Sequence, residues 1–449
     1  MTLPEISLTR WKQHSLARLE AFNPCFAYGT VERVNGTLIH GRLFSAQVGE
    51  LCRIEVKDGP ELLAEIVGFD QHNAVLSALG GVEGIRLGNR IEPLGHPHRV
   101  SVSDELLGQV LDGFGRSPND GPEAFADHTV TVATDVMSPG AHAIRRPRIS
   151  ELLTTGVRAL DGALSLGKGQ RVGLFAGAGC GKTTLVSEIA RNVNCDVIVF
   201  AMVGERSREL REFLDYELDD TLRAKSVVIC ATSDRSSMER SRAAFTATAI
   251  AEDFRRRGRQ VLLLVDSLTR YARAQREIGL AAGEPLGRGG LPPSVYSMLP
   301  RLVERAGLTE SGAITAIYTV LIEQDSMNDP VADEVRSLLD GHIVLSRKLA
   351  EHGHYPAIDV LASLSRIQSN VVDQDHQRLS NGLRRLLSAY SDVELMLRLG
   401  EYQRGHHALT DLAVDSREAV VAFLRQELRD PTPVNATIAH LAELANDVQ

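Results

Sequence analysis

The stretch LFAGAGCGKTTL, residues 174–185, constrains this chain more than any other because it contains Gly181-Lys182-Thr183. An apolar strand-like run precedes it, and apolar residues recur every four positions after it, as in a helix. A glycine-rich loop between a strand and a helix lets backbone N–H groups wrap a phosphate. The loop therefore predicts a nucleotide site formed by Gly177, Ala178, Gly179, Cys180, Gly181, Lys182, Thr183 and Thr184.

One position of the loop departs from the common G-x-x-x-x-G-K-[ST] pattern. Ala176 stands where that pattern begins with glycine. Alanine fits there if its backbone φ is negative, because only glycine adopts positive φ without cost.

Two carboxylates follow other apolar runs. Asp266 ends VLLLVD, and a carboxylate at the tip of a neighbouring strand, together with the Thr183 hydroxyl, suits the Mg²⁺ that accompanies a nucleotide. Glu205 follows VIVFAMVG, with Arg206 beside it. A glutamate next to the phosphates can take a proton from an attacking water, although a helix-capping carboxylate would give the same pattern. The prediction of hydrolysis, as opposed to binding, depends on Glu205.

The patterns along the chain predict an α/β fold in four parts. Turn dipeptides such as Asn35-Gly36 between short strand-like runs predict a small β-barrel. Continuous apolar runs that alternate with helix-like stretches predict a parallel sheet buried on both faces. The predicted parts are an amphipathic helix at 1–22, the barrel at 23–95, the nucleotide-binding domain at 96–375 and a helical domain at 376–449.

Composition narrows the class of protein. The chain of 449 residues has a formal net charge of -9 and 5% aromatic residues, which argues against a nucleic-acid partner. Its five cysteines lack metal-site spacing. No apolar run reaches the roughly 18 residues of a membrane span, and the N-terminus lacks a signal-peptide core. We therefore expect a cytoplasmic protein. The basic, amphipathic segment 1–22 could dock on a membrane or partner, or pack on its own chain.

Taken together, these motifs resemble the catalytic subunits of rotary ATP synthases. The segments that carry the likeness are AGAGCGKT at 176–183, VGER at 203–206, DSLTR at 266–270, YPAID at 355–359 and SLSR at 363–366. Residues 270–307 and 333–366 are most similar to the ATPases of type III protein secretion and to their flagellar export relatives. The resemblance covers about residues 24–405, and it implies that the nucleotide-binding domain is RecA-like. Alanine is common at the first loop position of that branch.

The resemblance implies a role for each matching residue. Lys182 and Thr183 match the phosphate and magnesium residues, Glu205 the catalytic carboxylate, Arg206 an arginine near the γ-phosphate, and Asp266 the metal-associated aspartate. Arg270 matches an arginine close to the catalytic site, Tyr355 a tyrosine that stacks on adenine, and Arg366 an arginine finger that reaches the neighbouring subunit's site. A structural salt bridge is the alternative role for Arg366. The second adenine-contacting aromatic is left open, with Tyr402 as a candidate.

The resemblance also implies a working context. It implies a homo-oligomer, expected to be a hexamer, that binds ATP and Mg²⁺ and lies at the cytoplasmic, inner-membrane base of a secretion apparatus. The implied partners are a central stalk protein, a stator-like regulator at the N-terminal helix, chaperone-substrate complexes and the export gate, with peripheral membrane contact. Hydrolysis would release substrates from their chaperones and prepare them for export. The alternatives are a flagellar export ATPase, a hexameric RNA translocase and a non-catalytic nucleotide-binding ring subunit.

Overall fold

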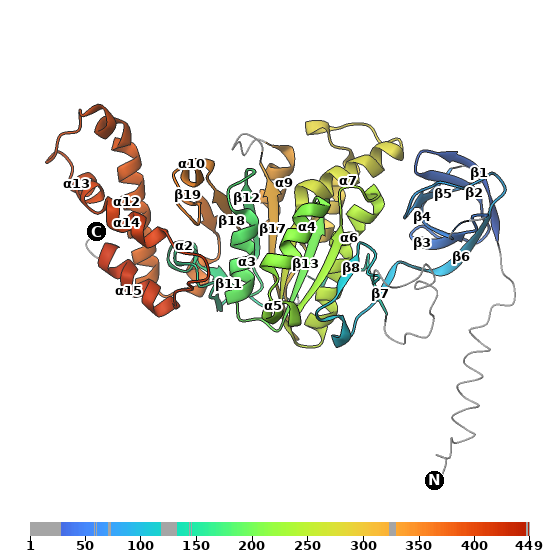
Figure 1. The fold of residues 1–449 in the computed structure, drawn as a ribbon, viewed down its shortest axis with the longest axis horizontal. Helices are drawn as coiled ribbons and strands as arrows, with labels where there is room; N and C mark the ends of the chain where they lie inside the picture. Colours follow the sequence, from blue (N-terminus) through green and yellow to red (C-terminus); the bar gives the residue numbers. More distant parts are fainter. Residues whose placement is uncertain are drawn as a thin grey trace, which may run out of the picture. The chain divides into compact units, whose positions relative to one another are not determined.

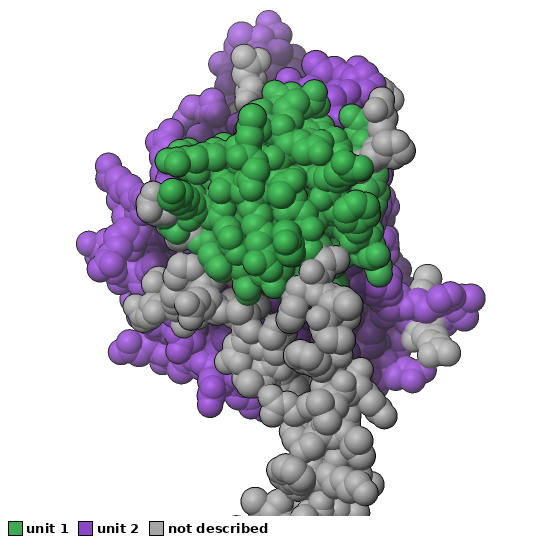
Figure 2. Space-filling view, turned by 90° about the vertical axis from the view of Figure 1, so that its right-hand side faces the viewer, with its two compact units in different colours: residues 1–97 green, residues 98–449 purple. Residues whose placement is uncertain are grey.

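The structure is a computed structural model that describes residues 28–57, 59, 61–70, 73–117, 133–142, 144, 146–322, 329–445 and 448. The helix expected at 1–22 lies outside these residues. The chain divides into two compact units, Met1–Pro97 and His98–Gln449, which are coloured separately in Figure 2. Within the part of the chain that the structure describes, none of the helices combines the length and apolar character needed to cross a membrane.

The first unit contains the predicted β-barrel (Figure 1). Its six strands close in the order β1-β2-β5-β4-β3-β6 around a core that includes Ile39, Ile54 and Leu76. Asn35 pairs with Leu38 across the predicted hairpin turn, where Gly36 has φ of 60°. The strands are β1 (Gly29–Asn35), β2 (Leu38–Arg42), β3 (Glu50–Ile54), β4 (Leu62–Asp70), β5 (Asn73–Ala78) and β6 (Arg90–Pro97).

The second unit is built on a nine-stranded sheet with the order β19-β18-β12-β17-β15-β13-β14-β8, and β16 pairs with β17 beside this path. The strands from β18 to β8 run parallel, whereas β19 is antiparallel to β18. The strands are β8 (Val110–Asp112), β12 (Arg171–Ala176), β13 (Val197–Val203), β14 (Ser226–Ala231), β15 (Gln260–Asp266), β16 (Gly307–Leu308), β17 (Ala313–Leu321), β18 (Gly341–Leu345) and β19 (Ile358–Ser365).

Both faces of this sheet are buried, as the continuous apolar runs predict. Along β13, Val199 packs into the core formed with α6 (Ser237–Arg256), whereas the adjacent Phe200 packs into the core formed with α3 (Lys182–Asn192). The first core also includes residues of α7 (Leu268–Ala281), α8 (Pro293–Val303) and α9 (Pro330–Leu338).

The chain ends in the predicted helical region, which belongs to the same compact unit as the sheet. Its helices are α12 (Gln374–Leu399), α13 (Ala408–Asp415), α14 (Arg417–Leu424) and α15 (Val434–Ala445). The predicted boundary between 375 and 376 stays a prediction. The shorter elements of the second unit are β7 (Arg99–Ser101), η1 (Asp104–Leu106), β9 (Ala133–Asp135), β10 (Leu152–Leu153), α2 (Arg158–Ala163), β11 (Leu166–Gly167), α4 (Ser207–Glu212), the π-helical η4 (Phe213–Glu217), α5 (Asp220–Ala224), η5 (Arg288–Gly290), α10 (Arg347–Glu351) and α11 (Gln368–Val371).

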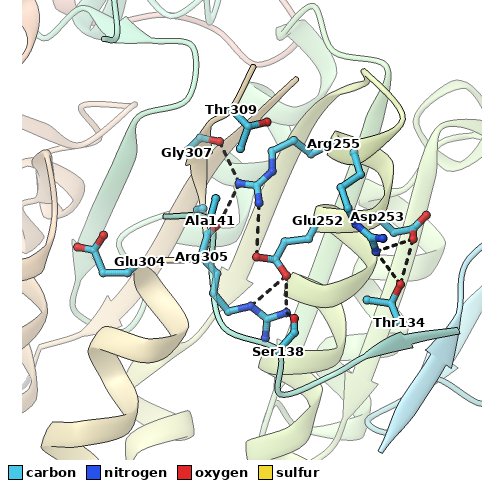
Figure 3. A network of polar contacts seen from close by, with 12 residues as sticks. Thr134, Ser138, Ala141, Glu252, Asp253, Arg255, Glu304, Arg305, Gly307 and Thr309 are labelled. Carbon is cyan, nitrogen blue, oxygen red and sulfur yellow. Dashed lines mark hydrogen bonds and ion pairs between the residues drawn. The ribbon is translucent and has the colours of Figure 1, made fainter. Parts of the chain in front are cut away.

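A buried ionic network ties the segment 133–142 to the sheet domain (Figure 3). Arg305, of which only 1% is exposed, donates through Nε to Glu252 Oε2 at 3.1 Å and through Nη1 to the carbonyl of Val136 at 2.6 Å. Arg255 donates to the carbonyl of Arg305 at 2.9 Å and lies 3.5 Å from the other oxygen of Glu252. One glutamate therefore balances two buried arginines.

Candidate active site

The candidate site lies where parallel strands of the sheet end. The strands β12, β15 and β13 lead into the phosphate loop, Asp266 and Glu205, respectively. Because the carboxyl ends of parallel strands meet at one edge of the sheet, these three segments come together. The structure thus brings Lys182, Glu205 and Asp266 into one cluster.

The loop has the backbone that a phosphate nest requires. Gly179 and Gly181 have φ of 80° and 79°, and α3 begins directly afterwards at Lys182. Such left-handed positions aim successive N–H groups to one side. Ala176 is buried at the end of β12, and its φ is not positive, because Ser45 and Arg429 alone have positive φ among the described non-glycine residues. Alanine therefore fits the start of the loop.

Lys182 and Arg270 bracket the two carboxylates. Lys182 Nζ forms an ion pair with Asp266 Oδ1 and lies 3.8 Å from Glu205 Oε1. Arg270 Nη2 donates to Glu205 Oε2 at 2.9 Å. Thr319, on β17, donates its hydroxyl to Asp266 Oδ1 at 2.7 Å. Each of these two carboxylates is thus held in place from one side by protein, and a third carboxylate, Glu209, lies 3.9 Å from Arg270 at the edge of the cluster.

Glu205 is the carboxylate whose chemistry is most altered. It is 5% exposed, and its Oε1 is buried without a hydrogen-bond partner among the described residues. Burial raises the pKa of Glu205 to about 8, with contributions in the same direction from Glu209 and Asp266. A carboxylate with a pKa near neutrality and one free oxygen is suited to accept a proton.

The donor set also fits Mg²⁺. Among the described residues, no group of three or more His, Cys, Asp or Glu side chains could hold a metal ion alone. Magnesium is usually held by one or two protein oxygens, water and substrate phosphates instead of a complete protein cage. Thr183, in the first turn of α3, and Asp266 supply oxygens of that kind beside the phosphate loop.

A pocket of about 630 Å³ extends from the loop, and this volume lies within the range of small-molecule binding sites. Tyr355 lines it. The Tyr355 ring lies so close to Gly181 that a Cβ atom placed on this glycine would be 3.6 Å from the ring. Thr184 and Cys180 line it as well. Tyr355 thus stands where a base could stack next to the phosphate loop.

One part of the wall of this pocket was not predicted from the sequence. It comes from residues 425–430, after α14, and Gln426 fastens it in place. The backbone N–H of Gln426 donates to the carbonyl of Tyr355 at 2.9 Å, and its side-chain amide donates to the carbonyl of Gly156 at 2.7 Å. Tyr402, the candidate second aromatic, does not line the pocket and donates to Asp411 at 2.6 Å. The role of Gln426 in the pocket wall could not be predicted, because a glutamine in a polar C-terminal stretch has no distinctive sequence pattern.

Two predicted site residues lie away from the cluster. The Arg206 side chain is 77% exposed and lies 3.8 Å from Glu209. Arg366 is exposed and follows β19, where its N–H donates to the carbonyl of Asp340 at 3.0 Å. Because Ser365 pairs with Gly341, Arg366 lies at the amino ends of the parallel strands, opposite the phosphate loop.

Comparison with known proteins identifies the family. Residues 156–365 match the nucleotide-binding domain of the ATP synthase alpha/beta family, residues 31–95 match its beta-barrel domain, and residues 372–443 match the T3SS EscN ATPase C-terminal domain. The type 3 secretion system ATPase of Pseudomonas syringae pv. tomato is 62% identical over 98% of this chain and 99% of its own length. The chain belongs to the type 3 secretion system ATPases.

Solved structures agree with this assignment. The assembled ATPase EscN from the enteropathogenic E. coli type III secretion system matches this type 3 secretion ATPase with a TM-score of 0.86 and 42% identity over 93% of the chain and 100% of EscN. EscN in complex with its central stalk EscO gives a TM-score of 0.84 at the same identity and coverage. The flagellum-specific ATP synthase of Bacillus subtilis is a more distant relative, at 44% identity over 94% of the chain and 95% of its own length.

Proposed function

We propose that this type 3 secretion ATPase hydrolyses ATP to ADP and phosphate at the cluster of Lys182, Glu205 and Asp266. The observation that supports hydrolysis most directly is Glu205, which is buried at the tip of β13 with one oxygen free and a raised pKa. A subunit that only bound nucleotide would not require a carboxylate in this state.

Each residue of the cluster has a distinct task in this proposal. The N–H groups of residues 178–183 and the Lys182 ammonium bind the β- and γ-phosphates. Glu205 accepts the proton of the attacking water, and Arg270 holds its other oxygen so that the free one faces the phosphates. Thr183 and Asp266 would hold Mg²⁺, which would supply positive charge beside the phosphates. Tyr355 stacks on the base.

We place the working enzyme in a homo-oligomeric ring, with Arg366 serving the site of the adjacent subunit. The location of Arg366 at the far end of the strands supports a role in trans, since its own phosphate loop lies at the opposite edge. The related EscN has been solved as an assembled ATPase. A hexamer is the ring size we propose.

The cellular role follows from the family. We propose that hydrolysis releases substrates from chaperones at the cytoplasmic, inner-membrane base of a secretion apparatus and prepares them for export. A central stalk is the partner with most support, because EscN is described in complex with its stalk EscO. A stator-like regulator, chaperone-substrate complexes, the export gate and peripheral membrane contact complete the proposed partners, without nucleic acid. A flagellar role is the second candidate, and 62% identity to a secretion ATPase against 44% to a flagellar one favours secretion.

The test is phosphate release from ATP by wild type and by Lys182→Ala. Since Lys182 contacts the transferred phosphate, we expect the variant to lose turnover while it still folds, as judged by circular dichroism. Lys168→Ala is the matched control, because Lys168 pairs with Glu151 on the surface at 2.8 Å. Equal turnover in wild type and Lys182→Ala, or no turnover by wild type at any concentration, would contradict the proposed function.

A further inference from the structure

The edge strand β19 presents an apolar surface next to Arg366. Leu361 and Leu364 are 43% and 46% exposed, although strands of such sheets are usually covered. Because side chains alternate along a strand, Leu364 and Arg366 lie on the same side of it. Leu364 therefore lies beside the predicted arginine finger, and Leu361 is exposed three residues earlier on the same strand.

This edge is held firmly by the residues behind it. The register between β18 and β19 shifts between His342 and Val344, so that β19 bulges outward there. Inside the bulge, the Ser363 hydroxyl accepts the N–H of Val344 at 2.9 Å, and Arg384 on α12 donates to the carbonyl of Ser363 at 2.9 Å. These bonds fix Ser363 inward, and Leu361 and Leu364 are left facing outward.

Arg366 cannot serve the phosphate site of its own chain. Gly341 and Leu345 lie at opposite ends of β18, which at about 3.3 Å per residue are roughly 13 Å apart. Leu345 is level with Ala176 before the phosphate loop, whereas Arg366 lies beyond Gly341. If Arg366 acts at a phosphate site, that site must therefore belong to another copy of the chain.

A second copy of the chain carries a complementary surface directly after its catalytic glutamate. Residues 205–220 contain seven carboxylates and three arginines, and Lys182, Arg270 and Arg191 of the same chain balance part of this negative excess. The negative charge that remains favours the approach of an arginine. The same residues include Tyr216, which is 74% exposed on η4. The exposed Tyr216 ring can pack against the exposed leucines, while the acidic residues around it face Arg366.

We propose that Leu361 and Leu364 dock on residues 205–220 of a second copy and thereby position Arg366 at that copy's Glu205. The two leucines are positioning residues, since they touch neither substrate nor reacting atoms. This inference rests on the ring in the proposed function and names the surface that forms it. Apolar contact here sets how tightly neighbouring subunits associate, while Arg366 sets how fast the formed site works.

The first test is photo-cross-linking of the full-length chain with a benzophenone amino acid in place of Leu364. We expect a covalent dimer whose linked peptide lies within residues 205–220, and we expect less product when Tyr216→Ser is introduced. If rings form but cross-link at another surface, or give no linked dimer, the proposed docking surface is wrong. The proposal of ATP hydrolysis would not be affected. If sedimentation detects no ring at any concentration, the ring in the proposed function fails as well.

The second test separates docking from catalysis. Leu361→Glu/Leu364→Glu should raise the protein concentration that gives half-maximal turnover by about tenfold or more, since each tenfold corresponds to about 1.4 kcal/mol of association. Arg366→Ala should shift that concentration much less than the leucine variant does, and it should lower the turnover at saturation. Leu395→Glu/Leu399→Glu is the matched control, because these leucines are exposed on α12. An unchanged concentration dependence in the β19 variant would contradict docking through the leucines.

Discussion

At the scale of single residues, the raised pKa of Glu205 makes a prediction about activity. A general base acts only when it is deprotonated, and kcat/KM reports the pKa of the free enzyme. Because burial raises the pKa of Glu205 to about 8, kcat/KM for ATP should climb about tenfold per pH unit between pH 6 and 7.5 and level off above pH 8. Phosphate release measured across this range checks the prediction.

Glu205→Gln is the critical variant in the same experiment. It should lower turnover by roughly 10²- to 10⁴-fold, the usual contribution of a general base, and abolish the pH dependence. Glu212→Gln is the control, since Glu212 is half exposed and pairs with Arg208 at 2.9 Å on the surface. A pH profile that survives in Glu205→Gln would assign the titration to another group.

The same group makes a prediction about stability that needs no substrate. The pKa of Glu205 is higher in the folded protein than in the unfolded chain, so ionisation of Glu205 opposes folding. Its contribution to stability is most favourable below about pH 4.5 and is lost as pH rises through about 8. Glu205→Gln should therefore raise Tm at pH 8.5 more than at pH 6.

At the scale of elements, the network in Figure 3 predicts that a single glutamate, Glu252, makes a large contribution to the stability of the fold. Glu252 on α6 balances Arg305 and Arg255, which are 1% and 4% exposed. Removing one partner of a buried ion pair costs about 3–5 kcal/mol, because the remaining charge stays desolvated. Glu252→Gln should lower the free energy of unfolding by about that amount, measured by denaturant titration.

An exposed pair supplies the comparison. Asp333 and Arg336 lie 3.2 Å apart on α9 with 63% and 42% of their side chains exposed. Exposed pairs contribute about 0–1 kcal/mol, so Asp333→Asn should change stability little. Comparable losses in the two variants would mean that the Glu252 network is not a buried ionic anchor.

The elements also explain which features the sequence could predict. The barrel, the parallel sheet and the cluster of Lys182, Glu205 and Asp266 follow from local periodicity and from strands that end at one edge. The pocket wall at residues 425–430 depends on how the C-terminal helices pack, and no local pattern encodes that contact. The arginines of the Glu252 network appear in sequence as ordinary charges near helix ends, and only packing makes them buried.

At the scale of the whole molecule, Arg366 predicts that two inactive variants restore each other. Lys182→Ala lacks the phosphate lysine but keeps Arg366, and Arg366→Ala has the reverse defect. In a mixed ring, an Arg366→Ala subunit whose neighbour is Lys182→Ala has a complete site, because a ring interface joins two different surfaces. With random equal mixing, about a quarter of interfaces are complete in this way.

Mixing the two variants should therefore raise phosphate release well above the sum of the separate rates, since an arginine finger contributes about 10³- to 10⁵-fold. Fluorescence energy transfer between labelled subunits establishes that they have mixed. The control replaces Arg366→Ala with the double variant Lys182→Ala/Arg366→Ala, which has no intact lysine to contribute and should give no recovery. If mixed rings of the two single variants stay as inactive as this control, Arg366 does not act in trans. The exposed end of β19 would then serve assembly without contributing to the chemistry.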